Sequence, residues 1–462
     1  MRNLLLGRFS GTFLFITFII LSCKSQVSQN NTTEKNIYKS TVVPNISDTA
    51  LVDLVQKQTV KYFWDFAHPV SGMARERSNK AYEYGLETVT TGGTGFGIMA
   101  LIVAADRKWI TRDSAAGLLL KLVKFLSKAD SYHGIFPHWM HGSTGKTIPF
   151  SSKDNGADIV ETSYLFEGLL CAREYFNSHN EKEIALRNNI NGLWNNADWN
   201  WHTNGKDELF WHWSPNNGWA MNFSIHGWNE CFITFLLAAS SPGHAIDANV
   251  YHKGWATGDH FKNGKSYYEL TLPLGFDYGG PLFFSQYSFM AIDPHGLKDQ
   301  YADYWLQNLN HTLINYRYCV ANPKKYKGYG ENCWGLTASD SYEGYDAHSP
   351  ENDLGVISPT AALSAFPYTP GYSMNALKHF YNDMGNKIWG EYGFVDAFNE
   401  TKNWQAQSYL AIDQGPIIVM IENYRTGLLW KLFMNCPEIQ NGLKKLGFES
   451  PYIKKEIPSL IK

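Results

Sequence analysis

The chain has 462 residues, of which 44% are hydrophobic, 15% aromatic and 18% charged. Its formal net charge of -3 excludes the strongly basic balance of proteins that bind nucleic acids or anionic membrane surfaces. The length is sufficient for an extensive core in one large domain or two ordinary ones. A neutral chain this rich in aromatic side chains suits neutral, hydroxylated ligands, because the apolar face of a sugar ring stacks on Trp or Tyr.

The first 23 residues are predicted to be a signal peptide with a lipobox. Arg2 gives a positive start, residues 13–21 form an apolar run too short for a membrane span, and the segment closes on ILSC at 20–23. This ending resembles a lipobox, in which Cys23 is lipidated after cleavage. The alternative is a plain signal peptide with a chance cysteine.

Residues 24–46 are rich in Ser, Asn, Thr and Lys, which predicts a flexible tether ahead of a single folded domain at 47–462. We expect an exported monomer whose only membrane attachment is the lipid at Cys23. The residues KSQV that follow Cys23 lack an acidic cluster resembling a surface-export signal, which favours the periplasmic side.

The five cysteines that follow Cys23 are scattered and include no CxxC pair, so the sequence predicts neither a disulfide framework nor a zinc site. No cofactor or metal is expected. A single bridge between Cys319 and Cys333 stays open.

Beyond the tether the periodicity of apolar residues is mainly helical. Helices are predicted at 50–67, 95–107, 113–129, 157–177, 183–201, 225–240, 297–320, 373–384 and 415–434, separated by long loops at 132–156, 203–222 and 326–359. No strand–helix alternation predicts a parallel sheet. Long helices joined by short turns and long loops, over roughly 400 residues, favour an all-α (α/α)6 barrel. The long loops would then form a cleft on one face.

The first string of acids is DNGADIVE at 154–161. If the helix begins at 157, Asp158 and Glu161 share one helix face, with Asp154 just before it. The alternative reading is structural, with Asp154 as N-cap and Asp158 as a first-turn acid. The loop before this helix contributes His138 and Trp139. A metal site of His133, His138 and His141 is the less favoured reading, because the spacing matches no common ligand pattern.

The second string, GWNE at 227–230, places Glu230 directly before a long apolar run. Apolar and indole surroundings raise the pKa of a carboxyl group, as a general acid at neutral pH requires. The structural alternative is a helix-start glutamate in a capping box.

The third string is IDQGP at 412–416. Pro416 at a first helical position would make Asp413 or the residue after it the helix cap. Asp413 is followed by aliphatic residues and has no basic neighbour nearby in the sequence. Glu422 and Arg425, three residues apart, are interpreted as a simple ion pair.

Several further strings are candidates for binding sugars or for close packing. The glycine-rich string TGGTGFG at 91–97 lacks the ending of a phosphate loop and is interpreted as close backbone packing at a helix start. The substrate-binding candidates are aromatic side chains with polar residues among them: Glu161, His138, Trp139, Trp211, Trp213, Trp228, Trp334 and Asp340.

Together the strings resemble the bacterial glucoamylase-like family, and in particular glycoside hydrolase family 144, the β-1,2-glucanases. The motifs that carry the resemblance run in order through 51–436: TGGTGFG (91–97), PHW (137–139), DNGADIVET (154–162), WNE (228–230), YSF (287–289), WGLTASD (334–340), ISPTAA (357–362) and IDQGP (412–416). The resemblance implies an (α/α)6 barrel and inverting hydrolysis of β-1,2-glucan without a metal. It also implies that the essential acids are Asp154, Asp158, Glu230 and Asp413.

We expect Glu230 to be the general acid and Asp413 the general base, with Asp154 and Asp158 holding sugar hydroxyls. The main rival assignment makes Asp158 the base. Endo action and exo action with release of sophorose both stay open. Two other classes are considered: a non-catalytic glycan-binding lipoprotein of an uptake system, and a polysaccharide lyase, which the scarcity of Arg and Lys in the motif loops disfavours.

Overall fold

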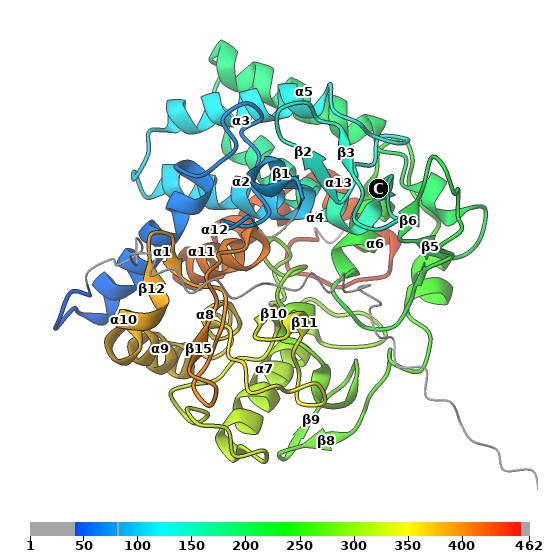
Figure 1. The fold of residues 1–462 in the computed structure, drawn as a ribbon. Helices are drawn as coiled ribbons and strands as arrows, with labels where there is room; N and C mark the ends of the chain where they lie inside the picture. The colour runs from blue at the N-terminus through cyan, green and yellow to red at the C-terminus, as the bar shows by residue number, and fades with distance from the viewer. Residues whose placement is uncertain (1–41, 81–82, 454–462) are drawn as a thin grey trace, which may run out of the picture. The chain divides into compact units, whose positions relative to one another are not determined.

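Helices build most of the fold (Figure 1). Along the chain, nearly fully buried helices alternate with half-buried ones in the N-terminal half. The computed structural model describes residues 42–80 and 83–453. Its α-helices are α1 (Asp48–Trp64), α2 (Thr91–Asp106), α3 (Arg112–Leu126), α4 (Ile159–Tyr175), α5 (Glu181–Asn196), α6 (Phe232–Ser240), α7 (Tyr304–Ala321), α8 (Pro359–Leu363), α9 (Pro370–Lys378), α10 (Gly385–Ile388), α11 (Ala411–Thr426), α12 (Leu428–Met434) and α13 (Pro437–Lys445). Shorter 3₁₀ and π helices are η1 (Gly85–Glu87), η2 (Asn200–Thr203), η3 (Val250–Trp255), η4 (Asp277–Gly279), η5 (Leu282–Ser285) and η6 (His379–Asp383).

The order of burial along the chain identifies the architecture. Helices α2, α4, α6 and α11 are buried on nearly every side, as the inner helices of a bundle must be. The preceding helices are amphipathic: α5, for example, buries one stripe made by residues 183, 186, 190 and 194. Within the described residues the alternation is clear for the pairs α1/α2, α3/α4 and α5/α6, and α11 adds a further inner helix that packs against α1 and α2. The predicted (α/α)6 barrel is confirmed.

The strands are short and belong to the loops. Strands β1 (Thr88–Thr90), β2 (Trp139–His141) and β3 (Thr147–Ile148) form one antiparallel sheet. The other described strands pair in twos: β4 (Ala157–Asp158) with β6 (His212–Trp213), β5 (Leu209–Phe210) with β7 (Ser224–Ile225), β8 (Ser266–Tyr267) with β9 (Leu270–Thr271), β10 (Ala338–Ser341) with β11 (Gly344–Ala347), β12 (Trp389–Gly390) with β13 (Gly393–Phe394), and β14 (Phe398–Asn399) with β15 (Trp404–Gln405). The β4–β6 pair brings the loop at 203–222 to the start of α4.

Glycines let the inner helices touch backbone to backbone. A Cβ on Gly95 of α2 would lie 1.9 Å from the carbonyl oxygen of Tyr164 on α4, and one on Gly168 of α4 would lie 2.2 Å from the carbonyl oxygen of Gly95. A Cβ on Gly415 of α11 would lie 2.4 Å from Cβ of Phe96. The prediction of close packing for the string at 91–97 is confirmed, since these glycines form the first turns of α2.

Several helix boundaries differ from the predicted ones, and local chemistry explains them. The helix predicted at 415–434 is two helices, because Gly427 adopts a left-handed φ of 67° that ends α11 and starts α12. Helix α11 also begins before its proline: Leu410 is the N-cap and Pro416 lies inside the helix. The expectation that Asp413 or its neighbour caps this helix is therefore wrong.

The ion pair predicted between Glu422 and Arg425 is also wrong. Glu422 is fully buried and binds Arg107, the C-cap of α2, with Nε and Nη2 at 2.8 and 2.9 Å from its two oxygens. Arg425 instead binds Asp53 of α1 at 2.5 Å. Both pairs join different helical segments, and the buried Glu422 takes the bidentate geometry that a guanidinium offers.

The ends of the chain leave part of the sequence analysis untested. The predicted signal peptide with Cys23 and residues 24–41 of the predicted tether lie outside the described residues, so lipidation and export stay predictions. Among the described residues, no helix combines the length and the apolar character needed to cross a membrane. The five cysteines described are buried free thiols, so Cys319 and Cys333 do not form a bridge.

The Gly95 contact generates a stability prediction. Gly95→Ala should lower the free energy of unfolding by about 1–3 kcal/mol, because the new methyl group overlaps the α4 backbone, which cannot move aside cheaply. Gly192→Ala is the matched control: it also lies inside a helix, but its Cβ would meet nothing within 4 Å. That control should be neutral or stabilising by up to about 1 kcal/mol. Urea unfolding of both variants checks this, and equal midpoints would contradict the packing described.

Candidate active site

Asp158 lies directly before α4, where its carboxylate accepts four hydrogen bonds. Its Oδ1 accepts from two backbone N–H groups of the first helical turn and from the Trp211 indole, each at 3.0 Å. Its Oδ2 lies 3.0 Å from Nδ1 of His138. Burial alone would raise the pKa of this carboxyl, but the His138 hydrogen bond and the His212 imidazole hold it below its usual value. Asp158 is therefore an ionised helix cap.

His138 connects Asp158 with Glu161. Its Nε2 lies 3.8 Å from Oε1 of Glu161, and its ring stacks on Phe150 with centroids 4.1 Å apart. Burial opposes a charge on this imidazole, but the carboxylates of Glu161 and Asp158 outweigh it and raise the pKa of His138 to about 10. Burial raises the pKa of Glu161, although the Gly92 N–H donates to its Oε2 at 2.8 Å. His138 is thus a cation between two acids at neutral pH.

Asp154 does not cap α4, because the Asp158 side chain occupies the helix N–H groups. It is buried, and its Oδ2 lies 3.3 Å from Nδ1 of His212. Donor atoms of His138, Asp154 and Asp158 lie within 4.8 Å of one another, close enough to share a cation. The protonated His138 already supplies a positive charge to this group, so the carboxylates are compensated without one.

The metal site considered from three histidines is wrong. Among the described residues, His133 and His141 belong to no group of metal-ligating side chains. His133 stacks on Trp201 with centroids 3.8 Å apart, and His141 lies 3.3 Å from Glu87.

Glu230 lies just before α6 and is 7% exposed. Burial raises the pKa of its carboxyl to about 7, and the nearby acids Glu161 and Asp158 add to the effect. The capping-box interpretation is wrong, because Cys231 is the N-cap of α6 and makes no side-chain cap. Ser288 donates to the backbone carbonyl of Glu230 at 2.6 Å, which holds this position of the chain. A carboxyl in this environment can release a proton near neutral pH.

Asp413, in the first turn of α11, is 1% exposed and lies beside a second buried acid, Asp396. If both acids were ionised, the two oxygens of Asp413 and Oδ1 of Asp396 would be buried without a hydrogen-bond donor. One proton on Asp396 supplies the missing donor. Burial and the neighbouring charge of Asp413 raise the pKa of Asp396 well above its usual range. Burial raises the pKa of Asp413 to about 7, against the lowering effect of the Asp396 hydrogen bond.

Arg77 and Asp340 complete this second group of acids. Nη1 of Arg77 lies 3.0 and 3.2 Å from the two oxygens of Asp340, and its Nε lies 2.9 Å from Glu76. Ser408 also donates to Asp340, and the backbone N–H of Asp340 donates to Asp396 at 2.6 Å. Asp340 is therefore tied to both a cation and the Asp396–Asp413 pair.

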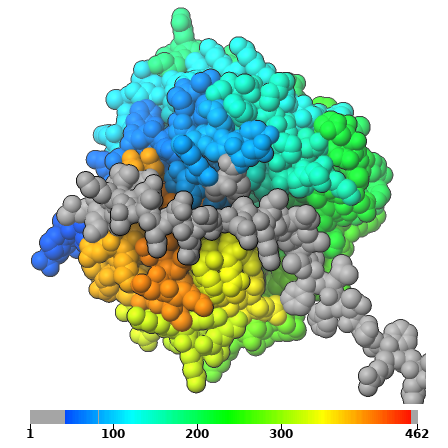
Figure 2. All heavy atoms as spheres, viewed as in Figure 1, coloured from blue at the N-terminus to red at the C-terminus, as the bar shows by residue number. Residues whose placement is uncertain are grey.

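The two groups of acids form one site. The first turn of α2 touches both groups: the Gly92 N–H donates to Glu161, and a Cβ on Gly93 would lie 2.7 Å from Cβ of Ala411, two residues before Asp413. Burial and the carboxyls of Asp413 and Glu161 raise the pKa of Tyr287, whose ring packs on Tyr164 with centroids 5.7 Å apart. His138 likewise affects the pKa of Glu76. The first group comes from the part of the chain coloured cyan and the second mainly from the yellow and orange parts, which occupy opposite halves of the face in Figure 2.

Asp396, Glu76 and Arg77 are site residues that the sequence analysis missed. Asp396 sits in GFVDAF at 393–398, an acid among apolar and aromatic residues, so the criterion that found Glu230 and Asp413 applies to it as well. Glu76 and Arg77 lie in a charged string that resembles an ordinary surface segment. Their role depends on contacts across the fold that no local pattern reveals.

Two of the predicted sugar-stacking indoles are core residues. Trp228 is fully buried and packs against Phe232 and Trp255, and Trp334 is fully buried against Tyr316. Neither can offer a ring face to a ligand, so these two predictions are wrong. The other predicted indoles are partly exposed, as platforms require: Trp139, Trp211 and Trp213.

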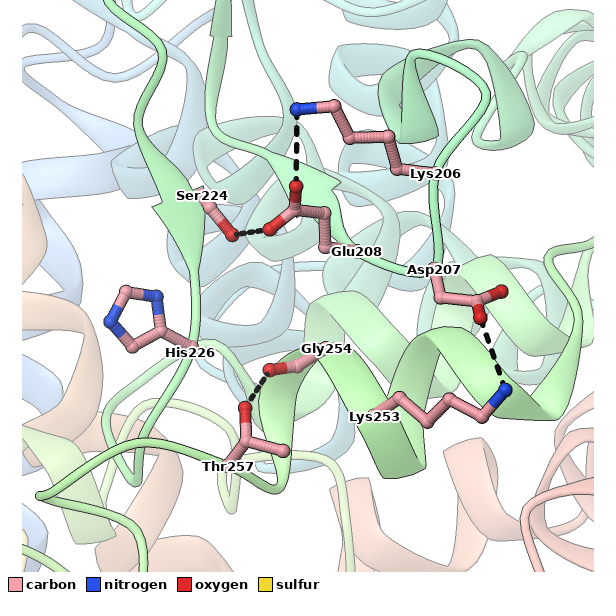
Figure 3. A pocket seen from close by; sticks show the side chains of 8 residues that line it. All are labelled: Lys206, Asp207, Glu208, Ser224, His226, Lys253, Gly254 and Thr257. Atoms are coloured by element: carbon pink, nitrogen blue, oxygen red, sulfur yellow. Dashed lines mark hydrogen bonds and ion pairs between the residues drawn. The ribbon is translucent and has the colours of Figure 1, made fainter.

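A separate pocket lies between β5, β7 and η3 (Figure 3). Its charged side chains neutralise one another: Lys206 lies 3.3 Å from Glu208, and Lys253 lies 3.2 Å from Asp207. Ser224 also donates to Glu208 at 2.5 Å. The pocket contains none of the acids described above.

Known proteins share the fold and much of the sequence of this chain. Residues 222–437 match a family model described as "Putative glucoamylase". A Bacteroides uniformis protein of the same description is 61% identical, with a TM-score of 0.88 over 89% of this chain and all of the other. The endo-β-1,2-glucanase of Chitinophaga pinensis, solved with sophorotriose and glucose, is 57% identical, with a TM-score of 0.86 over 88% of this chain and all of that enzyme.

A curated relative from Parabacteroides distasonis is an exo β-1,2-glucooligosaccharide sophorohydrolase (non-reducing end). It is 44% identical, and the match covers 90% of this chain but only 60% of the relative. The similarity in fold and in sequence extends over nearly the whole described chain. The chain belongs to the bacterial glucoamylase-like family, of the glycoside hydrolase family 144 type.

Proposed function

We propose that this protein is an inverting glycoside hydrolase that cleaves internal linkages of β-1,2-glucan, which is endo action. The observation that carries the proposal is the pair of buried carboxyls, Glu230 and Asp413, whose pKa values are both raised to about 7. Relatives of 44% and 57% identity are named for hydrolysis of β-1,2-linked glucose, which supports this substrate. Endo action is favoured because this protein is 57% identical to the endo enzyme and spans its whole length, whereas it is 44% identical to the exo enzyme and spans 60% of it.

In the proposed mechanism Glu230 donates its proton to the glycosidic oxygen as the bond to the anomeric carbon breaks. Asp413 takes a proton from a water whose oxygen attacks that carbon from the opposite face. Inverting enzymes hold the two carboxyls ~6.5–9.5 Å apart, to leave room for this water. The rival base, Asp158, is disfavoured because its lone pairs are occupied by four donors and its pKa is lowered.

The remaining polar residues would bind the sugar. Asp154, Glu161 and the His138 cation line the side of α4 and would hold hydroxyl groups, and Asp340 would do so from the other side. The partly exposed indoles would stack on ring faces, because pyranose C–H faces are apolar. Asp396 would act through Asp413 as a positioning residue, by donating the proton that the pair shares.

Incubation of the protein with linear β-1,2-glucan tests the function itself. We expect a range of oligosaccharides at the earliest time points and a rapid fall in viscosity, because an endo enzyme cuts anywhere along the chain. If sophorose is the sole product from the earliest time points, the enzyme is exo-acting and the endo proposal is wrong. Absence of cleavage would overturn the hydrolase proposal and favour a glycan-binding protein.

Glu230→Gln should reduce kcat by about 10² to 10⁴, because the amide keeps the shape but cannot donate the proton. Glu167→Gln is the matched control: Glu167 is also fully buried on α4, but its contact is the backbone N–H of Ala291 at 2.9 Å. That control should keep near wild-type turnover. Full turnover in Glu230→Gln would remove Glu230 from the acid role.

An activated substrate separates the two carboxyl roles. An aryl β-glycoside whose leaving group departs without protonation should restore most of the rate to Glu230→Gln, because the general acid is then unnecessary. The same substrate should not rescue Asp413→Asn, since attack by water still needs a base. Rescue of both variants or of neither would contradict the assignment.

The pH profile of kcat/KM should be a narrow bell centred near pH 7. Asp413 must be ionised, so the rate falls as pH drops through its pKa of about 7, and Glu230 must be protonated, so the rate falls as pH rises through its own. Asp396→Ala removes a donor that lowers the pKa of Asp413, so its acidic limb should move to higher pH. An unchanged acidic limb in that variant would contradict the shared proton.

A further inference from the structure

Three metal-ligating side chains from distant segments meet away from the acids of the active site. They are Cys333, in the turn after α7; His379, the first residue of η6; and Glu400, just after β14. Their donor atoms lie within 4.8 Å of one another. Cys333 is 2% exposed, and the other two are half-buried. A thiol, an imidazole and a carboxylate gathered in this way form a mixed donor set, which distinguishes the cluster from a solvated acidic patch.

The histidine of this cluster is oriented as a metal ligand. Its Nδ1 lies 2.8 Å from Oδ2 of Asp383, one turn further along η6. Donation of the Nδ1 proton to that carboxylate leaves Nε2 of His379 unprotonated, with its lone pair free. Nε2 is buried and makes no hydrogen bond. A buried nitrogen lone pair without a partner costs free energy unless something binds it.

The backbone holds the other two ligands in place. Cys333 and Gly330 exchange two backbone hydrogen bonds of 3.1 Å, which fixes the turn that carries the thiol. Gly328 has φ = 92°, and a Cβ at this position would lie 2.1 Å from Oε1 of Glu400. Only glycine allows this loop to pass so close to the carboxylate. The loop therefore covers the cluster on one side.

We propose that Cys333, His379 and Glu400 bind one Zn²⁺ ion, with Asp383 as the outer partner that orients the histidine. Thiolate, imidazole and carboxylate ligands suit zinc, and three protein ligands leave the fourth tetrahedral position for water. Binding releases the thiol proton of Cys333 to solvent. No short motif predicts this site, because its ligands come from segments far apart in the chain.

The zinc would cross-link the loops that carry part of the active site. Cys333 is followed by the segment that reaches Asp340, and the chain just before Glu400 contains Asp396. Asp340 and Asp396 are joined by the hydrogen bond described above. A metal that links these two segments and η6 stabilises the region in which Asp413 finds its partner. The role is structural, and it does not depend on which glycan the enzyme cleaves.

Metal analysis and cobalt substitution of the full chain test the proposal. We expect about one zinc per chain after purification without chelators. Co²⁺ in its place should give the visible bands of a tetrahedral site and a near-ultraviolet thiolate charge-transfer band. Cys333→Ser should lose that band and the bound zinc. Cys436→Ser is the matched control, since Cys436 is also a buried thiol but belongs to no metal-ligating group among the described residues.

Further variants keep the test decisive if Cys333→Ser does not fold. Glu400→Gln should lose the zinc-dependent rise in Tm that the wild type shows, and Asp383→Asn should weaken zinc binding by about 10- to 100-fold. Protein that takes up no zinc when it is supplied in excess would overturn the proposal. Uptake that is equal in Glu400→Gln, or cobalt binding without a thiolate band, would overturn the ligand assignment.

Discussion

Backbone N–H groups at helix starts make it possible to bury so many carboxyls in one place. Asp158 receives two such donors from the first turn of α4, and Glu161 receives one from Gly92 at the start of α2. The carboxylate with most donors, Asp158, stays ionised. Glu230 and Asp413 lack comparable donors, and burial raises their pKa values to about 7. The supply of donors therefore divides the acids into fixed charges and groups that can exchange protons.

At the start of α2 the same glycines serve helix packing and the placement of a charged side chain. The glycines that let α2 touch α4 also bring its first turn against Glu161, where a Cβ on Gly92 would lie 2.6 Å from the Glu161 carboxylate. A side chain at this position would displace the carboxylate from its donor. The contacts that hold the inner helices together thus position the acid as well.

Sequence patterns predicted most of the long helices and the buried setting of Glu230 and Asp413, because the helical period survives in long segments and an acid among apolar residues must be buried. The full barrel and the set of four acids depended also on the resemblance to the family. The sequence could not predict which side chains contact one another across the fold. Glu422 binds Arg107 across two helices rather than Arg425 within its own, and Asp396 becomes a site residue only through its contact with Asp413. The same limit explains Trp228 and Trp334: an indole beside a glycine fits both a sugar platform and a core, and long-range packing decides between them.

The pairing of the positively charged side chains in the site favours a neutral substrate over an acidic one. Arg77 is held by Asp340 and Glu76, and His138 lies between Asp158 and Glu161. Each positive charge among the described site residues thus compensates a carboxylate of the protein itself. A lyase that acts on uronic acids needs a cation for the carboxylate of its substrate, and the arrangement offers none beyond those already used. A neutral glucan requires only hydrogen bonds and stacking, which the acids and the partly exposed indoles proposed to bind sugar can provide.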